Sequence, residues 1–395
     1  MKRFLTLLVL ILLAVPAPVS ADDVADFRIE GGATETTVPF RFINDHIYVE
    51  AHVNEVAGLY ILDTGGQNSL MPDTAERLDL AMTGSRPVIG IGGHNAVSGT
   101  ARVDSIRIGH AVISNQPVSV FSFQNANVDG VDCAGMIGYE FFSRFVARLD
   151  YGKHTITFVD RDAFDPANAG TAVPMRVDNH YPEVSGTYAG IPARFLIDTG
   201  SRMPLTLSGR FAANHHLPRD GVEAVTGWGV GGPFRSTVQR GKALMLGSAR
   251  IDAPLTMIEV GNSGAAMIDG VLNDIGGGIL KRFAVTFDYQ HATMYLKPVE
   301  GPIADLDTFD RSGMWINAED REFKVIDVTK GGPAESAGLK PGDIIAAVDG
   351  VPAGRIGLHD LRYRLRNDPP GTKVVFAVKR GGGAEDVPLT LRDQF

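Results

Sequence analysis

Two Asp-Thr-Gly tripeptides carry the clearest chemistry in this 395-residue chain. They begin at Asp63 and Asp198, and an apolar run precedes each of them. Two carboxyls held about 3 Å apart cannot both ionise cheaply, so they share one proton. The ionised carboxyl can take a proton from water while the protonated one donates to a carbonyl oxygen. Such a pair is suited to hydrolysing amide bonds.

The residues around each aspartate favour this pairing. The preceding apolar strand would anchor the turn in a core and keep it rigid. Thr64 and Thr199 carry hydroxyls that can hydrogen-bond across to the opposite copy. Gly65 and Gly200 lack a Cβ, so the two backbones can approach closely. A single Asp-Thr-Gly occurs by chance in about one chain in ten of this length, but two copies at matching points of a repeat do not.

The repeat extends beyond the tripeptides, which lie 135 positions apart. At the same offset, Met136-Ile137-Gly138 aligns with Val271-Leu272-Asn273. This alignment makes Gly276 to Gly278 a three-residue insertion in the second copy. An internal duplication of this length indicates two structural units of one kind.

The rest of each copy predicts strands and few helices. Each copy closes with a strand pair around a short polar turn, at 146–151 with 155–159 and at 284–289 with 293–297. Brief helices are expected at 73–80 and 209–216. We therefore predict two β-rich lobes, residues 22–165 and 166–300, followed by a third unit.

Residues 30–298 resemble two tandem copies of the bacterial retropepsin-like aspartic peptidase unit. The resemblance implies a mainly β fold, in which two retropepsin-like lobes form a pepsin-like pseudo-dimer with the substrate between them. It implies that Asp63 and Asp198 bind the attacking water. The supporting turn residues would be Thr64, Gly65, Thr199, Gly200 and Ser201. A protein or peptide is the expected substrate, and no metal or organic cofactor is expected.

Two positions depart from the family pattern. After Asp-Thr-Gly the family has Ala or Ser, which Ser201 matches and Gly66 does not. Asn273 stands where the apolar-apolar-Gly triplet should end in glycine. Neither change removes a catalytic atom. Both leave open an alternative function, in which a catalytically degenerate peptidase fold acts as a peptide-binding or adaptor protein.

A glycine-rich stretch lies between the aspartate turn and the closing strands of each copy. Its residues are Gly90 and Gly92 in the first copy and Gly227, Trp228 and Gly229 in the second. The resemblance implies that this stretch is a flap over the substrate, with Trp228 covering a peptide. The alternative is a pair of ordinary hairpins with Trp228 in the core. No helix follows the glycines, which disfavours a phosphate site.

Residues 305–395 resemble the PDZ domains of bacterial proteases, a small α/β fold. The resemblance rests on Gly332-Pro333-Ala334-Glu335-Ser336-Ala337-Gly338-Leu339-Lys340-Pro341-Gly342-Asp343, followed by Val348-Asp349-Gly350. It implies a C-terminal peptide ligand added to a sheet edge. Its site would include Gly313, Met314 and Trp315 in the carboxylate-binding loop and His359 on the groove helix. The alternative is a PDZ fold that only packs against the lobes. The PDZ domain would either recruit substrate or regulate the peptidase.

The N-terminus predicts export. Lys2 and Arg3 precede an apolar run at 4–15 and a small-residue end at Ala21, which is typical of a signal peptide over residues 1–21. The run is shorter than the roughly 20 residues that span a membrane, so cleavage is favoured over an anchor. Cys133 is the only cysteine, which excludes an intramolecular disulfide. The periplasm is the expected location, with secretion second.

The composition and net charge limit the classes of partner that the protein can bind. The chain is 44% hydrophobic and 21% charged, as soluble globular proteins are. Its net charge of −9 becomes more negative when the signal's two cations are lost, which disfavours nucleic acid and anionic membranes. One chain supplies both aspartates, so a monomer is expected, with pairing between chains as the alternative. His215 and His216 diverge on a helix and predict no metal site, and Asp129 and Asp132 are expected in a surface loop.

Overall fold

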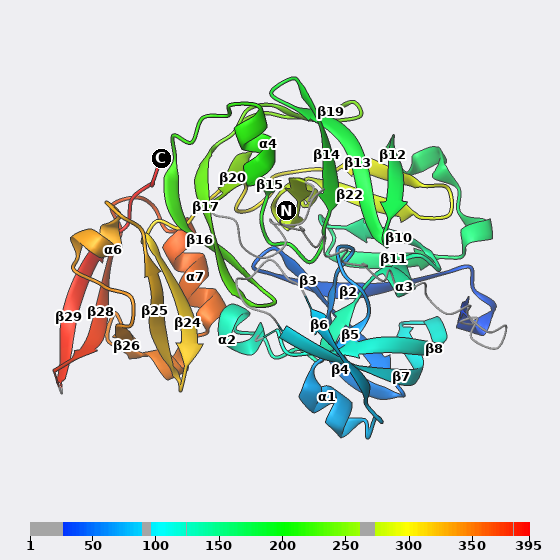
Figure 1. Cartoon of the computed structure of the whole chain (residues 1–395), viewed down its shortest axis with the longest axis horizontal. Helices are drawn as coiled ribbons and strands as arrows, with labels where there is room; N and C mark the ends of the chain where they lie inside the picture. The colour runs from blue at the N-terminus through cyan, green and yellow to red at the C-terminus, as the bar shows by residue number, and fades with distance from the viewer. Residues whose placement is uncertain (1–26, 89–95, 124, 261–272, 382) are drawn as a thin grey trace, which may run out of the picture.

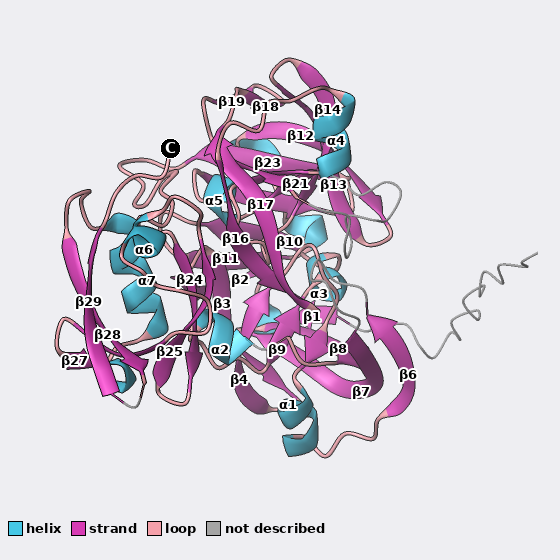
Figure 2. Ribbon diagram, turned by 60° about the vertical axis from the view of Figure 1, so that its left-hand side comes forward, coloured by secondary structure: helices cyan, strands magenta, loops and turns pink. Residues whose placement is uncertain are grey.

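The computed structural model describes residues 27–88, 96–123, 125–260, 273–381 and 383–395. The signal segment 1–21 and the first-copy flap residues Gly90 and Gly92 lie outside the described residues. Strands dominate the regular structure, as predicted (Figure 2). In the described part, no helix has the length and apolar character needed to cross a membrane.

Lobe 1 consists of the elements up to β11 and is built on a twisted sheet. Its strands are β1 (Phe27–Ile29), β2 (Glu35–Ile43), β3 (His46–Val53), β4 (Val56–Leu62), β5 (Ser69–Leu70), β6 (Thr83–Val88), β7 (Ala96–Ile108), β8 (Ala111–Val120), β9 (Gly135–Ile137), β10 (Val146–Asp150) and β11 (Thr155–Val159). Its helices are α1 (Pro72–Arg77), α2 (Asn125–Asp129) and α3 (Tyr139–Phe142), with short 3-10 turns at Glu30–Gly32, Arg161–Ala163 and Pro166–Asn168. Asn54 and Glu55 adopt positive φ and close the β3–β4 hairpin.

Lobe 2 repeats this plan from β12 to β23 (Figure 1). Its strands are β12 (Thr171–Asp178), β13 (Tyr181–Tyr188), β14 (Ile191–Ile197), β15 (Leu205–Leu207), β16 (Val222–Gly229), β17 (Gly232–Arg240), β18 (Leu244–Leu246), β19 (Ala249–Ile251), β20 (Leu255–Glu259), β21 (Asn273–Ile275), β22 (Phe283–Asp288) and β23 (Thr293–Pro298). Its helices are α4 (Gly209–Asn214) and α5 (Gly277–Leu280). The two short helices predicted from the sequence are thus present as α1 and α4.

A sheet shared by both lobes joins them. Its strand order is β2–β11–β10–β22–β23–β12, and the central pairing of β10 with β22 crosses between the lobes. The closing hairpins predicted from the sequence form this sheet. Phe141, Phe158 and Phe287 are fully buried in the core that it supports. The backbone hydrogen bonds between β10 and β22 thereby connect the two lobes.

The register of the central strands corrects the sequence alignment of the two copies. In lobe 1, β4 runs parallel to β9 with Leu62 opposite Ile137, and in lobe 2, β14 runs parallel to β21 with Ile197 opposite Ile275. The true counterpart of Met136-Ile137-Gly138 is therefore Asp274-Ile275-Gly276, and the predicted pairing with Val271-Leu272-Asn273 was wrong. The three extra residues of the second copy fall before β21, so Gly276 to Gly278 are no insertion.

The C-terminal domain forms a separate sheet with its own core. Its strands are β24 (Met314–Glu319), β25 (Glu322–Val328), β26 (Ile344–Val348), β27 (Val351–Pro352), β28 (Lys373–Arg380) and β29 (Gly383–Thr390). Its helices are α6 (Pro333–Ser336) and α7 (Leu358–Asn367), with a 3-10 turn at Ala353–Arg355. Leu361 and Leu365 of α7 are buried against Phe376 of β28. The domain presents α7 and β24 to the two lobes, with β29 on the far side (Figure 1).

Candidate active site

The two Asp-Thr-Gly turns meet at the junction of the lobes through a reciprocal set of hydrogen bonds. The backbone N–H of Thr64 donates to the Thr199 hydroxyl, and that of Thr199 donates to the Thr64 hydroxyl, both at 3.0 Å. Each hydroxyl in turn donates across the junction at 2.7 Å, Thr64 to the carbonyl of Ile197 and Thr199 to that of Leu62. Both threonines are fully buried. The network locks the two turns together.

The glycines of the turns bring each carboxyl against the opposite lobe. A Cβ at Gly65 would lie 2.5 Å from Cγ of Asp198, and a Cβ at Gly200 would lie 2.4 Å from Cγ of Asp63. Real Cβ atoms essentially never approach so closely. Glycine is therefore required at both positions, and the two aspartates lie side by side.

The electrostatics of the pair are unequal. Burial raises the pKa of Asp63 well above its usual value, and the charge of Asp198 raises it further. Burial also raises the pKa of Asp198, but hydrogen bonds from Asp63 and from the Gly200 N–H, the latter at 2.8 Å, oppose the rise. The two carboxyls titrate together as one pair. Burial together with the negative charge of the neighbouring carboxyl therefore favours one shared proton on the pair.

The departure at Gly66 has a geometric cause. A Cβ at Gly66 would lie 2.6 Å from Oδ2 of Asp63, so the Asp63 carboxyl as it is oriented here leaves no room for a side chain at residue 66. Gly138 is equally constrained, because its Cβ would lie 2.3 Å from the Gly66 carbonyl oxygen. Gly276 has the same relation to the Ser201 carbonyl oxygen, also at 2.3 Å. The second copy therefore keeps its glycine, and Asn273 is no departure from the pattern.

The glycine-rich stretch of lobe 2 forms the β16–β17 hairpin. Gly229 pairs with Gly232 at its tip, and a bulge separates Val225 from Gly227. A Cβ at Gly227 would lie 2.1 Å from the Phe234 ring, so this glycine is needed for the hairpin's own packing. Trp228 is partly buried against an apolar cluster of Val128, Val225 and Trp315. This cluster connects the hairpin to the C-terminal domain.

The predicted carboxylate-binding loop already holds a carboxylate of the chain itself. Oδ1 of Asp310 accepts the N–H groups of Ser312 at 2.9 Å and Gly313 at 2.8 Å. The Ser312 hydroxyl also donates to this oxygen at 2.6 Å, and the N–H of Met314 donates to the Ser312 hydroxyl at 3.3 Å. Burial raises the pKa of Asp310 to about 6 against these hydrogen bonds. No sequence signal pointed to this arrangement, because aspartates are common near turns.

The groove between β24 and α7 faces the lobes. The Trp315 ring contacts the guanidinium groups of Arg202, at 5.0 Å, and Arg362, at 4.7 Å. Arg362 donates to the carbonyl of Ile316 on β24 and to that of Val128 on lobe 1. His359 lies 3.0 Å from the amide oxygen of Asn44. Trp315 and His359, both predicted to bind peptide, therefore contact the peptidase lobes.

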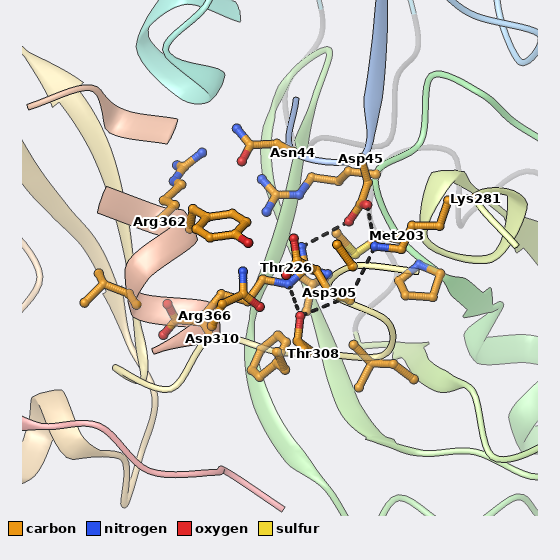
Figure 3. Close-up of a pocket in the computed structure, with 18 of the residues that line it drawn as sticks. Asn44, Asp45, Met203, Thr226, Lys281, Asp305, Thr308, Asp310, Arg362 and Arg366 are labelled. Carbon is orange, nitrogen blue, oxygen red and sulfur yellow. Dashed lines mark hydrogen bonds and ion pairs between the residues drawn. The ribbon is translucent and has the colours of Figure 1, made fainter. Parts of the chain in front are cut away.

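Two buried aspartates of lobe 1 hold the three units together. Asp45 lies 3.0 Å from both Lys281 of lobe 2 and Arg366 of α7, beside a cavity of about 450 Å³ (Figure 3). Burial alone would raise the pKa of Asp45, but these two cations lower it to about 2. Asp129 is 2% exposed and contacts His46 at 3.0 Å. The expectation that Asp129 lies in a surface loop was wrong, because Asp129 ends α2 and also faces Arg202 of lobe 2 and Arg362 of α7, each at 3.8 Å.

Comparisons with known proteins agree with both resemblances. Residues 49–141 match the family model described as aspartyl protease, and residues 312–391 match the PDZ domain model. The chain thus carries an aspartyl protease segment in lobe 1 and a PDZ domain at its C-terminal end. The equivalence of lobe 2 rests on the matching strand register and turns described above.

Curated relatives match over shorter stretches. A carboxyl-terminal-processing protease of Synechocystis sp. is 35% identical over 79 residues, which is 20% of this chain and 18% of that protein. A probable periplasmic serine endoprotease DegP-like of Chlamydia trachomatis is 40% identical over 67 residues, which is 17% of this chain and 13% of that protein. The chain therefore spans less than a fifth of the length of each. The aspartic proteinase of Irpex lacteus aligns with 68% of this chain and 99% of its own, at 12% identity and a TM-score of 0.45.

Proposed function

We propose that this protein is an aspartic endopeptidase whose catalytic pair is Asp63 and Asp198. The observation that carries the proposal is the reciprocal fit of each carboxyl against the glycine of the opposite turn, where a Cβ would lie only 2.5 Å or 2.4 Å from the carboxyl carbon. Neither lobe alone can provide two carboxyls in contact. The threonine network keeps them in place, so a water bound between them would be oriented for attack.

In the proposed mechanism the two carboxyls have different roles. Asp198, the ionised carboxyl, takes a proton from the water as its oxygen attacks the peptide carbonyl carbon. Asp63, which holds the shared proton, donates it to the carbonyl oxygen, giving a neutral tetrahedral diol. As the C–N bond breaks, Asp198 passes its proton to the amine, and a diol hydroxyl returns a proton to Asp63. The pair ends in its starting state.

The alternative of a degenerate peptide-binding protein has lost one of its two sequence arguments. That alternative relied on Gly66 and Asn273 as departures from the family pattern. Gly276 rather than Asn273 occupies the triplet's glycine position, so only Gly66 still departs from the family pattern. No described residue of the site favours binding without turnover.

The PDZ domain regulates the peptidase by docking on it. Asp310 occupies the loop that would bind a ligand's C-terminal carboxylate, and the Trp315 side chain contacts two arginines. Asp327 of β25 also accepts the Val225 N–H of the β16–β17 hairpin at 3.1 Å. This contact supports control of the hairpin, which would act as a flap over the substrate, rather than recruitment of free peptide tails.

We propose further that the protein is exported to the periplasm and acts there as a monomer. Its substrates would be exported proteins or peptides. Purified residues 22–395 should cleave denatured casein at acidic pH, and a statine-type peptide should inhibit the cleavage. The mature N-terminus in cells, read by mass spectrometry, should follow Ala21. Absence of cleavage from pH 3 to 8, together with unmodified bound peptide, would contradict the proposed activity.

A further inference from the structure

Asp274 is a partly buried residue with a buried carboxyl oxygen, Oδ1, and the dyad mechanism does not use it. It occupies the place on β21 that Met136 occupies on β9. In lobe 1 this place is apolar, since Met136 packs against Tyr48, Ile61 and Cys133. Lobe 2 therefore differs from lobe 1 in having an ionisable group beside its aspartate turn.

The strand register places this carboxyl close to the dyad. Asp274 is opposite Leu196 on β14, and partners in a parallel pair project to the same face. Asp198 follows two positions after Leu196 and continues the ladder, because its N–H donates to the Ile275 carbonyl at 3.0 Å. Asp274 and Asp198 therefore lie on one face of the strand pair.

The surroundings of Asp274 leave its charge poorly compensated. Its Oδ1 is buried and, among the described residues, has no hydrogen-bond partner. Burial raises its pKa well above the usual value, and the charge of Asp198 raises it further. The Ser201 hydroxyl opposes the rise by hydrogen bonding, while Glu259 of β20 and Asp63 reinforce it. These are the groups that act on Asp274 from the packed elements.

The two lobes differ at two positions that belong together. Lobe 2 has Ser201 after its Asp-Thr-Gly and Asp274 on the adjacent strand, whereas lobe 1 has Gly66 and Met136. Lobe 2 therefore has both polar residues, Ser201 and Asp274, and lobe 1 has neither. A buried carboxyl without compensation is costly, and the side chain that hydrogen-bonds Asp274 belongs to the residue that ends the catalytic turn.

We propose that Asp274 is a positioning residue of the catalytic site, a third carboxyl that holds the Asp198 turn through Ser201 and helps the dyad to keep its shared proton at higher pH. This inference rests on the proposed peptidase function. The expected direction of the effect on the dyad's proton follows from repulsion between like charges. At low pH Asp274 is neutral and leaves the dyad undisturbed. Once Asp274 ionises, its negative charge makes loss of the dyad's proton harder.

The test is the pH profile of kcat/KM for Asp274→Asn, with Glu259→Gln as the matched control for losing one carboxyl in the same lobe. We expect the acidic limb of Asp274→Asn to stay in place and its alkaline limb to move to lower pH, by on the order of one unit. Glu259→Gln should shift the alkaline limb far less. Ser201→Ala should lower kcat in the wild-type background and have little further effect in Asp274→Asn, because the two residues act as a unit.

The outcomes separate the inference from the proposed function. Wild-type cleavage with a superimposable Asp274→Asn profile, or strictly additive effects of the two substitutions, would overturn the inference alone. A wild-type protein that neither cleaves nor binds a statine-type peptide would overturn the proposed function. If Asp274→Asn fails to fold, Asp274→Met, which introduces the residue type of lobe 1, provides the same comparison. The pH dependence of statine-peptide binding gives a second readout of the same limb.

Discussion

Gly65 and Asp198, which belong to different lobes, are in such close contact that a Cβ on the glycine would lie 2.5 Å from Cγ of the aspartate. Gly200 and Asp63 repeat the relation at 2.4 Å. The chemistry needs two carboxyls in contact, and each lobe contributes one carboxyl together with the space for the other. Duplication of the lobe within one chain satisfies that requirement.

Gly65→Ala and Gly200→Ala should each separate the carboxyls and reduce kcat/KM by roughly 100-fold or more, since a misplacement of about 1 Å costs that much. The control is Gly383→Ala, where a Cβ would meet nothing within 4 Å. Steady-state kinetics on a fluorogenic peptide would measure the effect. Unchanged activity in Gly65→Ala would show that the turns are not packed as described.

Thr64→Val and Thr199→Val should destabilise the junction of the lobes. Each change removes a hydroxyl that both accepts and donates, leaving a buried N–H and a buried carbonyl without partners. The expected loss is about 2–4 kcal/mol in the free energy of unfolding. Thr83→Val, at an exposed hydroxyl bonded to the Thr100 carbonyl, is the control. Denaturant unfolding that shows equal stability for all three variants would refute the network's role.

Asp310→Ala should convert the PDZ loop into a carboxylate site. The N–H groups of Ser312 and Gly313 would lose their internal acceptor and become free for a ligand. We expect a peptide with a free C-terminus to bind the variant at least about tenfold more tightly than wild type, because hydrogen bonds to charged groups are worth about 1.5–3 kcal/mol. The same peptide with an amidated C-terminus should gain nothing. Calorimetric titration would show whether both peptides gain equally, which would contradict the role of Asp310.

Asp45→Asn should weaken docking of the PDZ domain in a pH-dependent manner. The folded pKa of Asp45 is lowered to about 2 from 3.8, so its stabilising effect is present above about pH 4 and is lost as the pH falls through 2. The difference in unfolding free energy between wild type and Asp45→Asn should therefore be largest at about pH 5 and shrink towards about pH 2. Asp252→Asn, at an exposed pair with Arg250, is the control. A difference that is constant over this range would argue against the ion-pair mechanism.

The sequence predicted the features that depend on local pattern. The apolar strands leading into Asp63 and Asp198, the closing hairpins and the short helices all follow from periodicity and turn residues. The alignment of the central triplets failed, because the three extra residues of lobe 2 precede β21 and a constant offset of 135 could not accommodate them. Hydrogen-bond register, which decides such alignments, is set by tertiary pairing.

Features created by docking were also beyond prediction. Asp129 has the sequence neighbours of a loop residue, but it is buried among His46 of lobe 1, Arg202 of lobe 2 and Arg362 of α7. Asp310 lies two residues before the loop whose N–H groups it binds, a relation that depends on the turn's backbone geometry. The constant offset placed Val271 rather than Asp274 opposite Met136. The sequence alignment therefore gave no sign of a third carboxyl beside the dyad.

The central claim is that Asp63 and Asp198 form one catalytic pair, and the most direct test compares Asp63→Asn and Asp198→Asn with wild type in the same peptide-cleavage assay. Both variants should retain the wild-type circular dichroism spectrum and lose cleavage by a factor of about 10³ or more, because each carboxyl has a separate role in proton transfer. If either folded variant retained wild-type kcat/KM, the shared-proton dyad would be contradicted.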